Sequence, residues 1–202
     1  MNILHVSCSA RGPASESTRL AQGIIDHLLA AQPSAQVLTR HIGGNVMAHV
    51  DSNYATSQQS TADVSLDGSA ALSALLIGEL EQADVLVIGT PMHNFSLPSA
   101  LKAWIDHVAR VRHTFDVGAN GKTGRLRDRP VFIAVSSGGR FTGERARQVD
   151  FLTPYLTAVL NMIGLQDLTF FSVEGTALGN ESLAHARSAA AQALQAHFSA
   201  RR

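Results

Sequence analysis

The chain has 202 residues, of which 45% are hydrophobic and 16% charged, a composition that excludes a disordered protein and suits one well-buried domain better than two. Sixteen lysines and arginines balance sixteen aspartates and glutamates, so no basic surplus is available to neutralise a nucleic-acid backbone or an anionic membrane surface. We therefore expect a single domain over residues 1–202 that binds neither nucleic acid nor membrane.

The first part of the chain predicts a strand, a polar loop and a helix. Apolar residues at the N-terminus indicate the strand, and Ser17 is placed to cap a helix over about residues 18–31. A short second strand is expected over residues 36–40. Residues 43–66 are rich in Ser, Thr, Asn and Gln, and indicate a long excursion with at most a turn or two of helix.

Strands and helices continue to alternate in the rest of the chain. Further helices are expected over residues 67–82, 98–111, 147–163 and 181–200, and further strands over residues 84–89, 131–135 and 167–173. Five strands alternating with five helices predict an α/β fold with a doubly wound parallel sheet. Ligands of such sheets bind beyond the carboxyl ends of the strands, which directs attention to the loops after strands one, three and four.

The loop after the first strand suits an anion. It contains Ser9, Arg11, Ser15 and Ser17 and leads directly into a helix, whose unpaired N–H groups and positive dipole end favour a phosphate. The spacing matches neither G-x-x-x-x-G-K-[ST] nor G-x-G-x-x-G. On this loop alone, a second interpretation stays open, in which the serines only cap the helix.

The other two loops suit a flat heterocycle. Met92 and Phe95 offer apolar contact, and the Asn94 amide can bind a polar ring edge. In the loop after the fourth strand, Gly138 and Gly139 allow main-chain N–H groups to approach a planar ligand without a Cβ in the way.

The motif Pro91-Met92-His93-Asn94-Phe95, followed by Leu101-Lys102-x-Trp104-Ile105-Asp106, resembles the FMN-dependent NADH:quinone oxidoreductases known as azoreductases. The similarity continues in Thr114-Phe115, Gly121, Leu152-Thr153-Pro154-Tyr155-Leu156, Ile163-Gly164 and Glu174-Gly175, so it extends over essentially the whole chain. It implies a flavodoxin-like fold with a five-stranded parallel sheet of order 2-1-3-4-5, helices on both faces, and one FMN per subunit.

The resemblance also implies the residues of the site. Those expected to hold the FMN phosphate are Ser9, Ser15, Glu16 and Ser17; those expected along the isoalloxazine and ribityl chain are Met92, His93, Asn94 and Phe95; and those expected at the pyrimidine end of the ring are Ser136, Ser137, Gly138 and Gly139. Two residues depart from the family pattern. His93 stands where tyrosine is common, and Val117 stands where several relatives have an aromatic residue near the substrate.

The implied reaction is the reduction of quinones to hydroquinones and the reductive cleavage of azo bonds, with NADH or NADPH as electron donor and ping-pong turnover through flavin N5. No catalytic side chain is expected. The Gly138 and Gly139 N–H groups would polarise the flavin carbonyl edge, and His93 either protonates a product or merely packs at the pocket. The family usually forms homodimers, for which Trp104, Ile105, Val108 and Val111 offer apolar surface unless they belong to the core.

Three alternatives remain at this stage: a flavodoxin-like electron carrier, a phosphate-binding regulator without flavin, and a related FMN reductase with another acceptor. Carriers of the first kind are usually strongly acidic, whereas this chain is formally neutral. The sequence does not choose between NADH and NADPH.

Cysteine and histidine usage limits other chemistry. The single cysteine, Cys8, excludes an intramolecular disulfide and fits a reducing compartment. No apolar run approaches the ~18 residues that span a bilayer, and the N-terminus lacks the features of a signal peptide. A cytoplasmic protein is therefore expected. Cys8 is either reactive or a small buried residue. Histidine spacings predict no metal site. The basic residues Lys122, Arg125, Arg127 and Arg129 indicate a solvated loop or, alternatively, a polyanion site.

Overall fold

The computed structural model describes residues 1–44, 47–59 and 68–200. Its main sheet is parallel and has the order β2-β1-β3-β6-β7. The strands are β1 (Asn2–Ser7), β2 (Gln36–His41), β3 (Val85–Pro91), β6 (Val131–Ser137) and β7 (Leu168–Glu174). Counted along the chain, these five strands have the predicted order 2-1-3-4-5.

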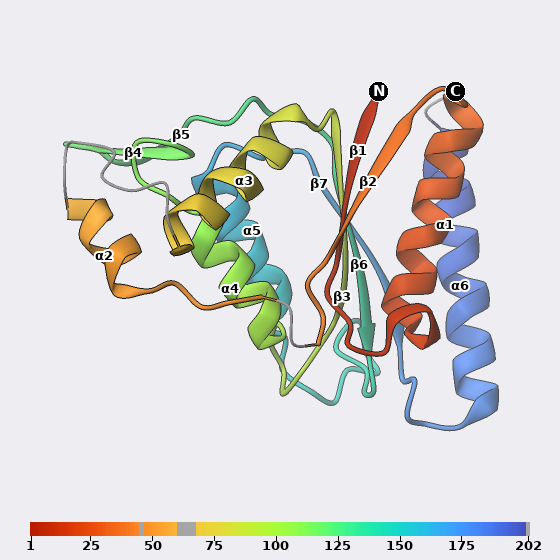
Figure 1. The fold of residues 1–202 in the computed structure, drawn as a ribbon. Coiled ribbons are helices and arrows are strands. Elements are labelled where there is room, and N and C mark those ends of the chain that lie inside the picture. Colours follow the sequence, from red (N-terminus) through yellow and green to blue (C-terminus); the bar gives the residue numbers. More distant parts are fainter. Residues whose placement is uncertain (45–46, 60–67, 201–202) are drawn as a thin grey trace.

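Helices cover both faces of this sheet (Figure 1). One face carries α1 (Glu16–Ala31) and α6 (Asn180–Ser199), and the other carries α3 (Gly68–Gln82), α4 (Ser99–Val108) and α5 (Leu152–Met162). Strand β6 is buried along its whole length, as expected of a strand covered on both sides. Alternate side chains enter different cores: Ile3 packs with α1 and α6, while Leu4 and Val6 pack with the other three helices.

Three helix boundaries differ from the sequence expectation by two residues or more. Helix α1 begins at Glu16, so Ser17 lies inside its first turn and the prediction that Ser17 caps the helix was wrong. Helix α4 ends at Val108. Helix α5 begins at Leu152 because the Asp150 carboxylate accepts the N–H groups of Leu152 and Thr153, each at 2.9 Å, which fixes the start of the helix there.

The long excursion contains one short helix, α2 (Ser52–Gln59), in agreement with the expected turn or two; residues 45–46 and 60–67 of this region lie outside the described chain. Tyr54 anchors α2, because its hydroxyl donates to the main-chain carbonyl of Asp106 at 2.8 Å. A short 3-10 helix, η1 (Gly12–Ala14), precedes α1.

A hairpin formed by β4 (Phe115–Gly118) and β5 (Gly121–Gly124) was missed by the sequence analysis. Its glycines suggested an irregular segment, but they allow the hairpin backbone to approach the backbone after α5 closely. A Cβ on Gly124 would lie 2.3 Å from the main-chain nitrogen of Gly164, directly after α5. Backbone therefore packs on backbone where the hairpin meets α5, and no larger residue fits at position 124 without displacement.

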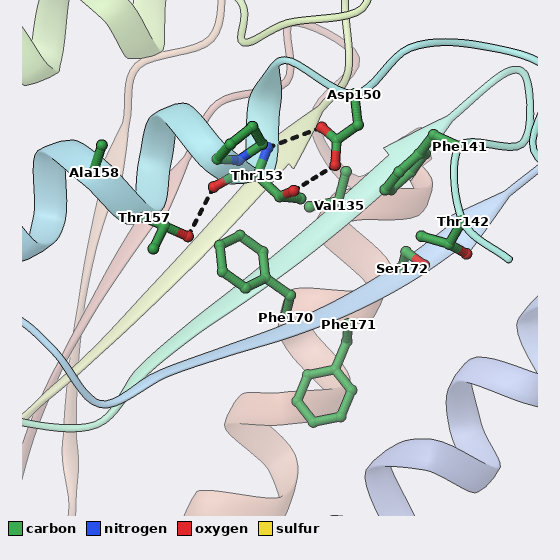
Figure 2. A pocket seen from close by; sticks show the side chains of 11 residues that line it. Val135, Phe141, Thr142, Asp150, Thr153, Thr157, Ala158, Phe170, Phe171 and Ser172 are labelled. Carbon is green, nitrogen blue, oxygen red and sulfur yellow. Dashed lines mark hydrogen bonds between the residues drawn. The ribbon is translucent and has the colours of Figure 1, made fainter.

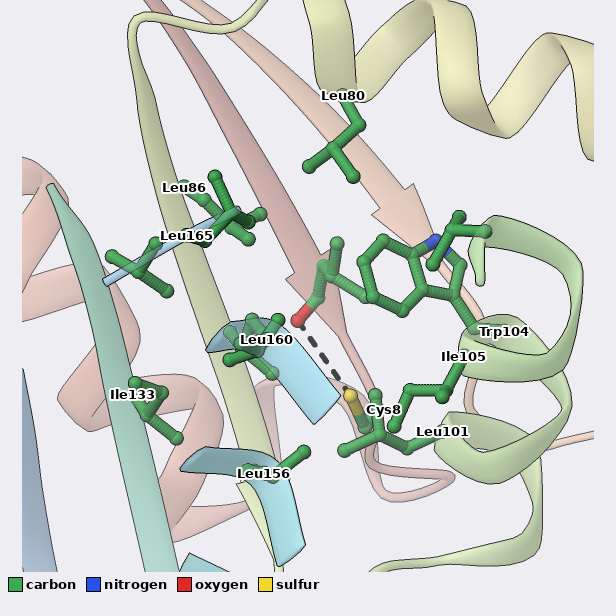
Figure 3. Packing of buried hydrophobic residues seen from close by; sticks show 14 of the residues in the cluster. Cys8, Leu80, Leu86, Leu101, Trp104, Ile105, Ile133, Leu156, Leu160 and Leu165 are labelled. Carbon is green, nitrogen blue, oxygen red and sulfur yellow. Dashed lines mark hydrogen bonds between the residues drawn. The ribbon is translucent and has the colours of Figure 1, made fainter. Parts of the chain in front are cut away.

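The core beneath α3, α4 and α5 surrounds Trp104 and Cys8 (Figure 3). Trp104, Ile105 and Val108 are at most 2% exposed, so of the two interpretations left open for them, core packing holds and dimer surface does not; Val111 is partly exposed. Cys8 is buried, and its thiol donates to the Val6 carbonyl at 3.7 Å. Burial raises the pKa of this thiol far above its usual range, which makes Cys8 a packing residue and not a nucleophile.

Among the residues that the structure describes, no group of three or more His, Cys, Asp or Glu side chains is arranged to hold a metal ion. In the same part of the chain, no helix is both long and apolar enough to cross a membrane.

Arg129 does not belong to a solvated cluster. Its side chain is buried and donates to the main-chain carbonyls of Leu80 and Ala83, at the C-terminal end of α3. A cation at this position satisfies carbonyls that have no helical partner and complements the helix dipole. The neighbouring Arg125 and Arg127 are exposed and pair with Asp116 and Asp84.

His5 is a buried polar residue on the α1 side of the sheet. It is 4% exposed, and its Nε2 atom has no hydrogen-bond partner among the described residues. Burial lowers the pKa of His5 to about 4, with the nearby His41 as a second cause. His5 is therefore neutral at pH 7.

Replacing Arg129 with methionine should destabilise the fold by about 2–4 kcal/mol, because several carbonyls at the end of α3 lose a charged donor in a buried setting. Urea denaturation followed by circular dichroism measures the change. The control is Arg125→Met, which removes an exposed ion pair and should cost less than about 1 kcal/mol. Equal losses in the two variants would contradict the capping role.

Because of His5, the free energy of unfolding should decrease as the pH is lowered from 6.5 to about 4. In this window the unfolded chain takes up a proton that the folded chain does not bind, so the full stability exists above pH 6.5 and up to about 3 kcal/mol is lost on acidification. His5→Leu should remove this component. Urea midpoints at pH 7 and 4.5 test it, with the exposed His185→Leu as control; an unchanged pH dependence in His5→Leu would sink the interpretation.

Candidate functional site

Three loops meet at the carboxyl edge of the parallel sheet. The N–H of Cys8, just after β1, donates to the carbonyl of Gly89 in β3 at 2.9 Å. The N–H of Met92, just after β3, donates to the carbonyl of Ser136 in β6 at 2.7 Å. The structure thus brings together the loops after β1, β3 and β6, which are those that the topology singles out for ligand binding.

The loop after β1 presents buried hydroxyls at the start of α1. Ser9, Ser15 and Ser17 are all less than 9% exposed, and the hydroxyls of Ser15 and Ser17 lie 2.9 Å apart. No side chain caps α1, and the main-chain N–H groups of residues 16–18 find no acceptor in the described part of the chain. Orphan helix donors beside buried hydroxyls are what a phosphate group requires.

Two glycines permit this arrangement. A Cβ on Gly89 would lie 3.0 Å from the Ala21 Cβ and 3.2 Å from the Ser17 carbonyl oxygen, so α1 sits directly on the end of β3. A Cβ on Gly43 would lie 2.3 Å from the carbonyl carbon of Ser9. Position 43, just beyond β2, therefore supports the serine loop through backbone contact alone.

Glu16 does not present its carboxylate to the serines. Both carboxylate oxygens accept from Arg187 of α6, at 2.7 and 2.8 Å, and one also accepts from Arg19 at 2.9 Å. The hydrogen bond from Arg187 lowers the pKa of Glu16 below its ordinary value. The side chain is thus an anchor between α1 and α6, and only the main-chain N–H of Glu16 is available to an anion.

The loop after β3 is a tight turn. His93 and Ser96 exchange main-chain hydrogen bonds of 2.8 and 2.9 Å, and the two residues between them have positive φ, 47° at Asn94 and 69° at Phe95. This is the type I′ geometry that usually places glycine at the second position. Phenylalanine there carries roughly 1–3 kcal/mol of strain, which is a frequent sign of a functional position.

Side chains of this turn divide into one that is buried and three that are exposed. Met92 is 9% exposed, and its sulfur accepts from Gln148 Nε2 at 2.9 Å. His93, Asn94 and Phe95 are exposed, with Phe95 at 48%. The turn therefore offers an exposed aromatic ring and an amide at the sheet edge, on a base held by Met92.

The loop after β6 offers main-chain donors. Ser136 and Ser137 are buried at the end of the strand, while the N–H groups of Gly138 and Gly139 have no acceptor in the described part of the chain. Their carbonyls accept from Ala177 at 3.2 Å and Gly175 at 3.0 Å, which holds the loop against the end of β7. Free donors on a fixed loop can bind the carbonyl edge of a ring.

Three residues that support these loops were not found from the sequence. Gln148 donates to Ser137 Oγ at 2.7 Å as well as to Met92, and its amide oxygen would be 2.3 Å from a Cβ on Gly139. The N–H of Phe151 donates to the Phe95 carbonyl at 2.9 Å. The Glu174 carboxylate accepts from the N–H groups at positions 141 and 142. Placing a helix over residues 147–163 hid the first two.

A larger hollow, of about 580 Å³, lies beside this region, between α5 and the edge strand β7 (Figure 2). Its walls are mainly apolar, with Phe141, Pro154 and Phe170 among them. Asp150, its charged residue, is occupied in capping α5. None of the twelve predicted site residues lines it.

The donor set at the sheet edge fits FMN. Buried hydroxyls and orphan helix N–H groups suit its phosphate, and the exposed turn with the Gly138 and Gly139 donors suits a flat ring with a polar edge. Val117, at 65% exposure, lies on the hairpin and outside the three loops.

Comparison with known proteins identifies the family of this chain. A family model described as flavodoxin-like fold matches residues 1–198. A Pseudomonas fluorescens protein named FMN-dependent NADH:quinone oxidoreductase 4 is 45% identical over 183 residues, which cover 90% of this chain and 88% of that protein. A protein of the same kind from Burkholderia lata is 41% identical, with 95% and 93% covered.

Solved structures share the fold at low sequence identity. An azoreductase from Bacillus anthracis has a TM-score of 0.85 at 17% identity, with 98% of each chain covered. An FMN-dependent NADH-azoreductase from the same species, solved in complex with FMN, has a TM-score of 0.80 at 21% identity, with 98% of this chain and 99% of that chain covered. The chain therefore belongs to the flavodoxin-like-fold family and, within it, to the FMN-dependent NADH:quinone oxidoreductases.

Proposed function

We propose that this protein is an FMN-dependent oxidoreductase that uses NADH or NADPH to reduce quinones to hydroquinones and to cleave aromatic azo bonds. The observation that carries the proposal is the uncapped start of α1, with its buried serines, at the same sheet edge as the strained turn at Asn94 and Phe95. The relatives named FMN-dependent NADH:quinone oxidoreductase support the same activity.

The phosphate of FMN is assigned to the start of α1. The hydroxyls of Ser9, Ser15 and Ser17 donate to it, together with the main-chain N–H groups of residues 16–18. Glu16 takes part through its N–H alone, since Arg187 and Arg19 hold its carboxylate. Because both arginines neutralise that carboxylate, its negative charge weakens phosphate binding little.

The ring is assigned to the two other loops. Phe95 and Met92 supply apolar contact, and Asn94 and the main chain of His93 supply polar contact along the ring and ribityl chain. Ser136 and Ser137 end β6 and position Gly138 and Gly139, whose free N–H groups bind the pyrimidine edge. The contacts of Gln148 keep these two loops in register.

FMN, when bound, supplies hydride acceptance from a dihydronicotinamide and two-electron delivery to an acceptor. The protein's own residues bind and orient, and no side chain is assigned a catalytic role. The N–H groups of Gly138 and Gly139 are fixed donors that stabilise negative charge at the ring edge without reorganisation. We expect ping-pong kinetics, with donor and acceptor using one exposed face in turn.

We further propose that residues 1–202 form a single FMN-binding domain and that the protein works in the cytoplasm as a homodimer with one FMN per subunit. The exposed apolar side chains of Phe95, Val149 and Phe151 near the site are consistent with cover by a second subunit.

Purified protein reconstituted with FMN should be yellow and should oxidise NADH or NADPH when benzoquinone or methyl red is present. Absorbance at the flavin bands and at the dihydronicotinamide band measures both properties. An electron carrier would bind flavin but show no steady-state donor oxidation without a separate reductase. A phosphate-binding regulator would bind no flavin, and either result would refute the proposal.

Ser17→Ala should weaken FMN binding by about tenfold, because a buried hydroxyl donor to the phosphate is lost. Fluorescence titration of the apoprotein with FMN measures this affinity. The control is Ser73→Ala, which removes an equally buried helical serine whose hydroxyl donates to the His107 carbonyl at 2.6 Å. That variant should lose stability while binding FMN like the wild type, and equal FMN affinities in both variants would contradict the assignment.

A further inference from the structure

Besides the apolar hollow between α5 and β7, a second hollow, lined by arginines, adjoins the loop assigned to the flavin ring. It has a volume of about 340 Å³ and is lined by Gly139, Arg140, Arg145, Arg147 and Leu178. Small-molecule sites range from about 300 to 1,000 Å³, so this hollow accommodates a part of a ligand. Because Gly139 belongs to both places, whatever occupies the hollow lies beside the ring loop.

The chain folds so that three arginines line this hollow. The carbonyl of Arg140 accepts the N–H groups of Arg147 at 2.9 Å and Gln148 at 3.3 Å, which closes residues 140–148 into a compact loop. The Arg140 side chain lies over Gly175 and donates to Ser182 Oγ at 3.4 Å. Arg147 donates through Nη1 to the main-chain carbonyls at positions 144 and 146, which orients its guanidinium.

The positive charge of the hollow is not neutralised within the described part of the chain, where none of the three arginines forms an ion pair. A neighbouring hollow of about 390 Å³ also contacts Arg140 and Arg145, but it is lined by Glu144 and Glu174 as well. Three permanent cations without a carboxylate favour a polyanion in the smaller hollow and disfavour one in the larger.

The phosphate of FMN does not account for this second cationic place. FMN has one phosphate, which is assigned to the buried serines at the start of α1, on the β1 and β3 side of the sheet edge. The arginines lie at the β6 and β7 side, beyond Gly139. Of the remaining reactants, the dinucleotide donor carries phosphate, and its pyrophosphate is joined through one ribose to the nicotinamide ring that must meet the flavin.

We propose that Arg145 and Arg147, supported by Arg140, bind the pyrophosphate of the NADH or NADPH donor. This inference rests on the proposed function and adds a donor-binding site to it. Guanidinium groups form paired hydrogen bonds with phosphate oxygens, and the exposed Leu178 gives the adjoining nucleoside an apolar surface. Arg145 and Arg147 are exposed, so replacing them leaves the core intact.

The test compares FMN-loaded wild type with the double variant Arg145→Gln/Arg147→Gln, using benzoquinone as acceptor and three donors. NADH and NADPH contain the pyrophosphate, whereas dihydronicotinamide riboside lacks it. The double variant should raise the KM for NADH and NADPH alike by about tenfold or more, because charge-assisted hydrogen bonds to phosphate are lost. The KM for the riboside, kcat and flavin content should stay unchanged.

A binding measurement without turnover accompanies the kinetics. ADP-ribose, which carries the pyrophosphate but no nicotinamide, should bind the oxidised holoenzyme, and calorimetry should show at least about tenfold weaker binding to the double variant. The matched control is Arg127→Gln, which removes an exposed arginine beside Asp84 at the opposite end of β3 and should behave like the wild type in every assay.

The remaining outcomes overturn the assignment. An effect confined to NADPH would place the ribose 2′-phosphate, and not the pyrophosphate, at the arginines. An equal effect on the riboside would show that the loop acts on the flavin or the nicotinamide itself. If the double variant is loaded with flavin, is active and has unchanged donor affinities, the arginines are not the donor site, and the proposed function stands. If the wild type binds no flavin and oxidises no donor, the proposed function itself is refuted.

Discussion

The arrangement of the site depends on the direct contact between the first turn of α1 and the end of β3. Gly89 makes this contact possible, because any side chain there would meet Ala21 and the Ser17 carbonyl. Because the first turns of α1 contact the end of β3 directly, Ser15 and Ser17 are buried, while the N–H groups at the start of the helix stay unpaired among the described residues. The same strand end leads into the turn at Asn94, so one close approach sets the distance between the anion-binding and ring-binding loops.

Charge is distributed along the sheet edge in a consistent way. Near the serines, the Glu16 carboxylate is neutralised by two arginines, and the buried His5 is uncharged at pH 7 because burial lowers its pKa to about 4. The helix dipole is then the main field at that end. At the other end, three arginines line a hollow that has no carboxylate among its lining residues, although Glu144 and Glu174 line the neighbouring hollow. A formally neutral chain thus concentrates positive potential where phosphate-bearing molecules would bind.

The sequence predicted the main sheet well because its signals were strong. Continuous apolar runs in β3 and β6 are typical of strands buried on both faces, and polar loops follow them directly. It failed where tertiary contacts decide local structure. The hairpin was hidden by glycines that are required for packing against Gly164, and the start of α5 depends on Asp150. The ion pair of Glu16 with Arg187 was not foreseen, because the two residues lie far apart in sequence and only the fold brings α1 and α6 together.

The hairpin of β4 and β5 combines a fixed base with an exposed tip. Gly124 rests on the backbone after α5, whereas Val117 and the residues of the β-turn face solvent. The base is therefore closely packed against the rest of the chain, whereas the exposed side chain of Val117 makes little packing contact. Substitutions at the tip should therefore disturb the fold less than substitutions at the base, so any constraint on the identity of Val117 comes from function and not from the core.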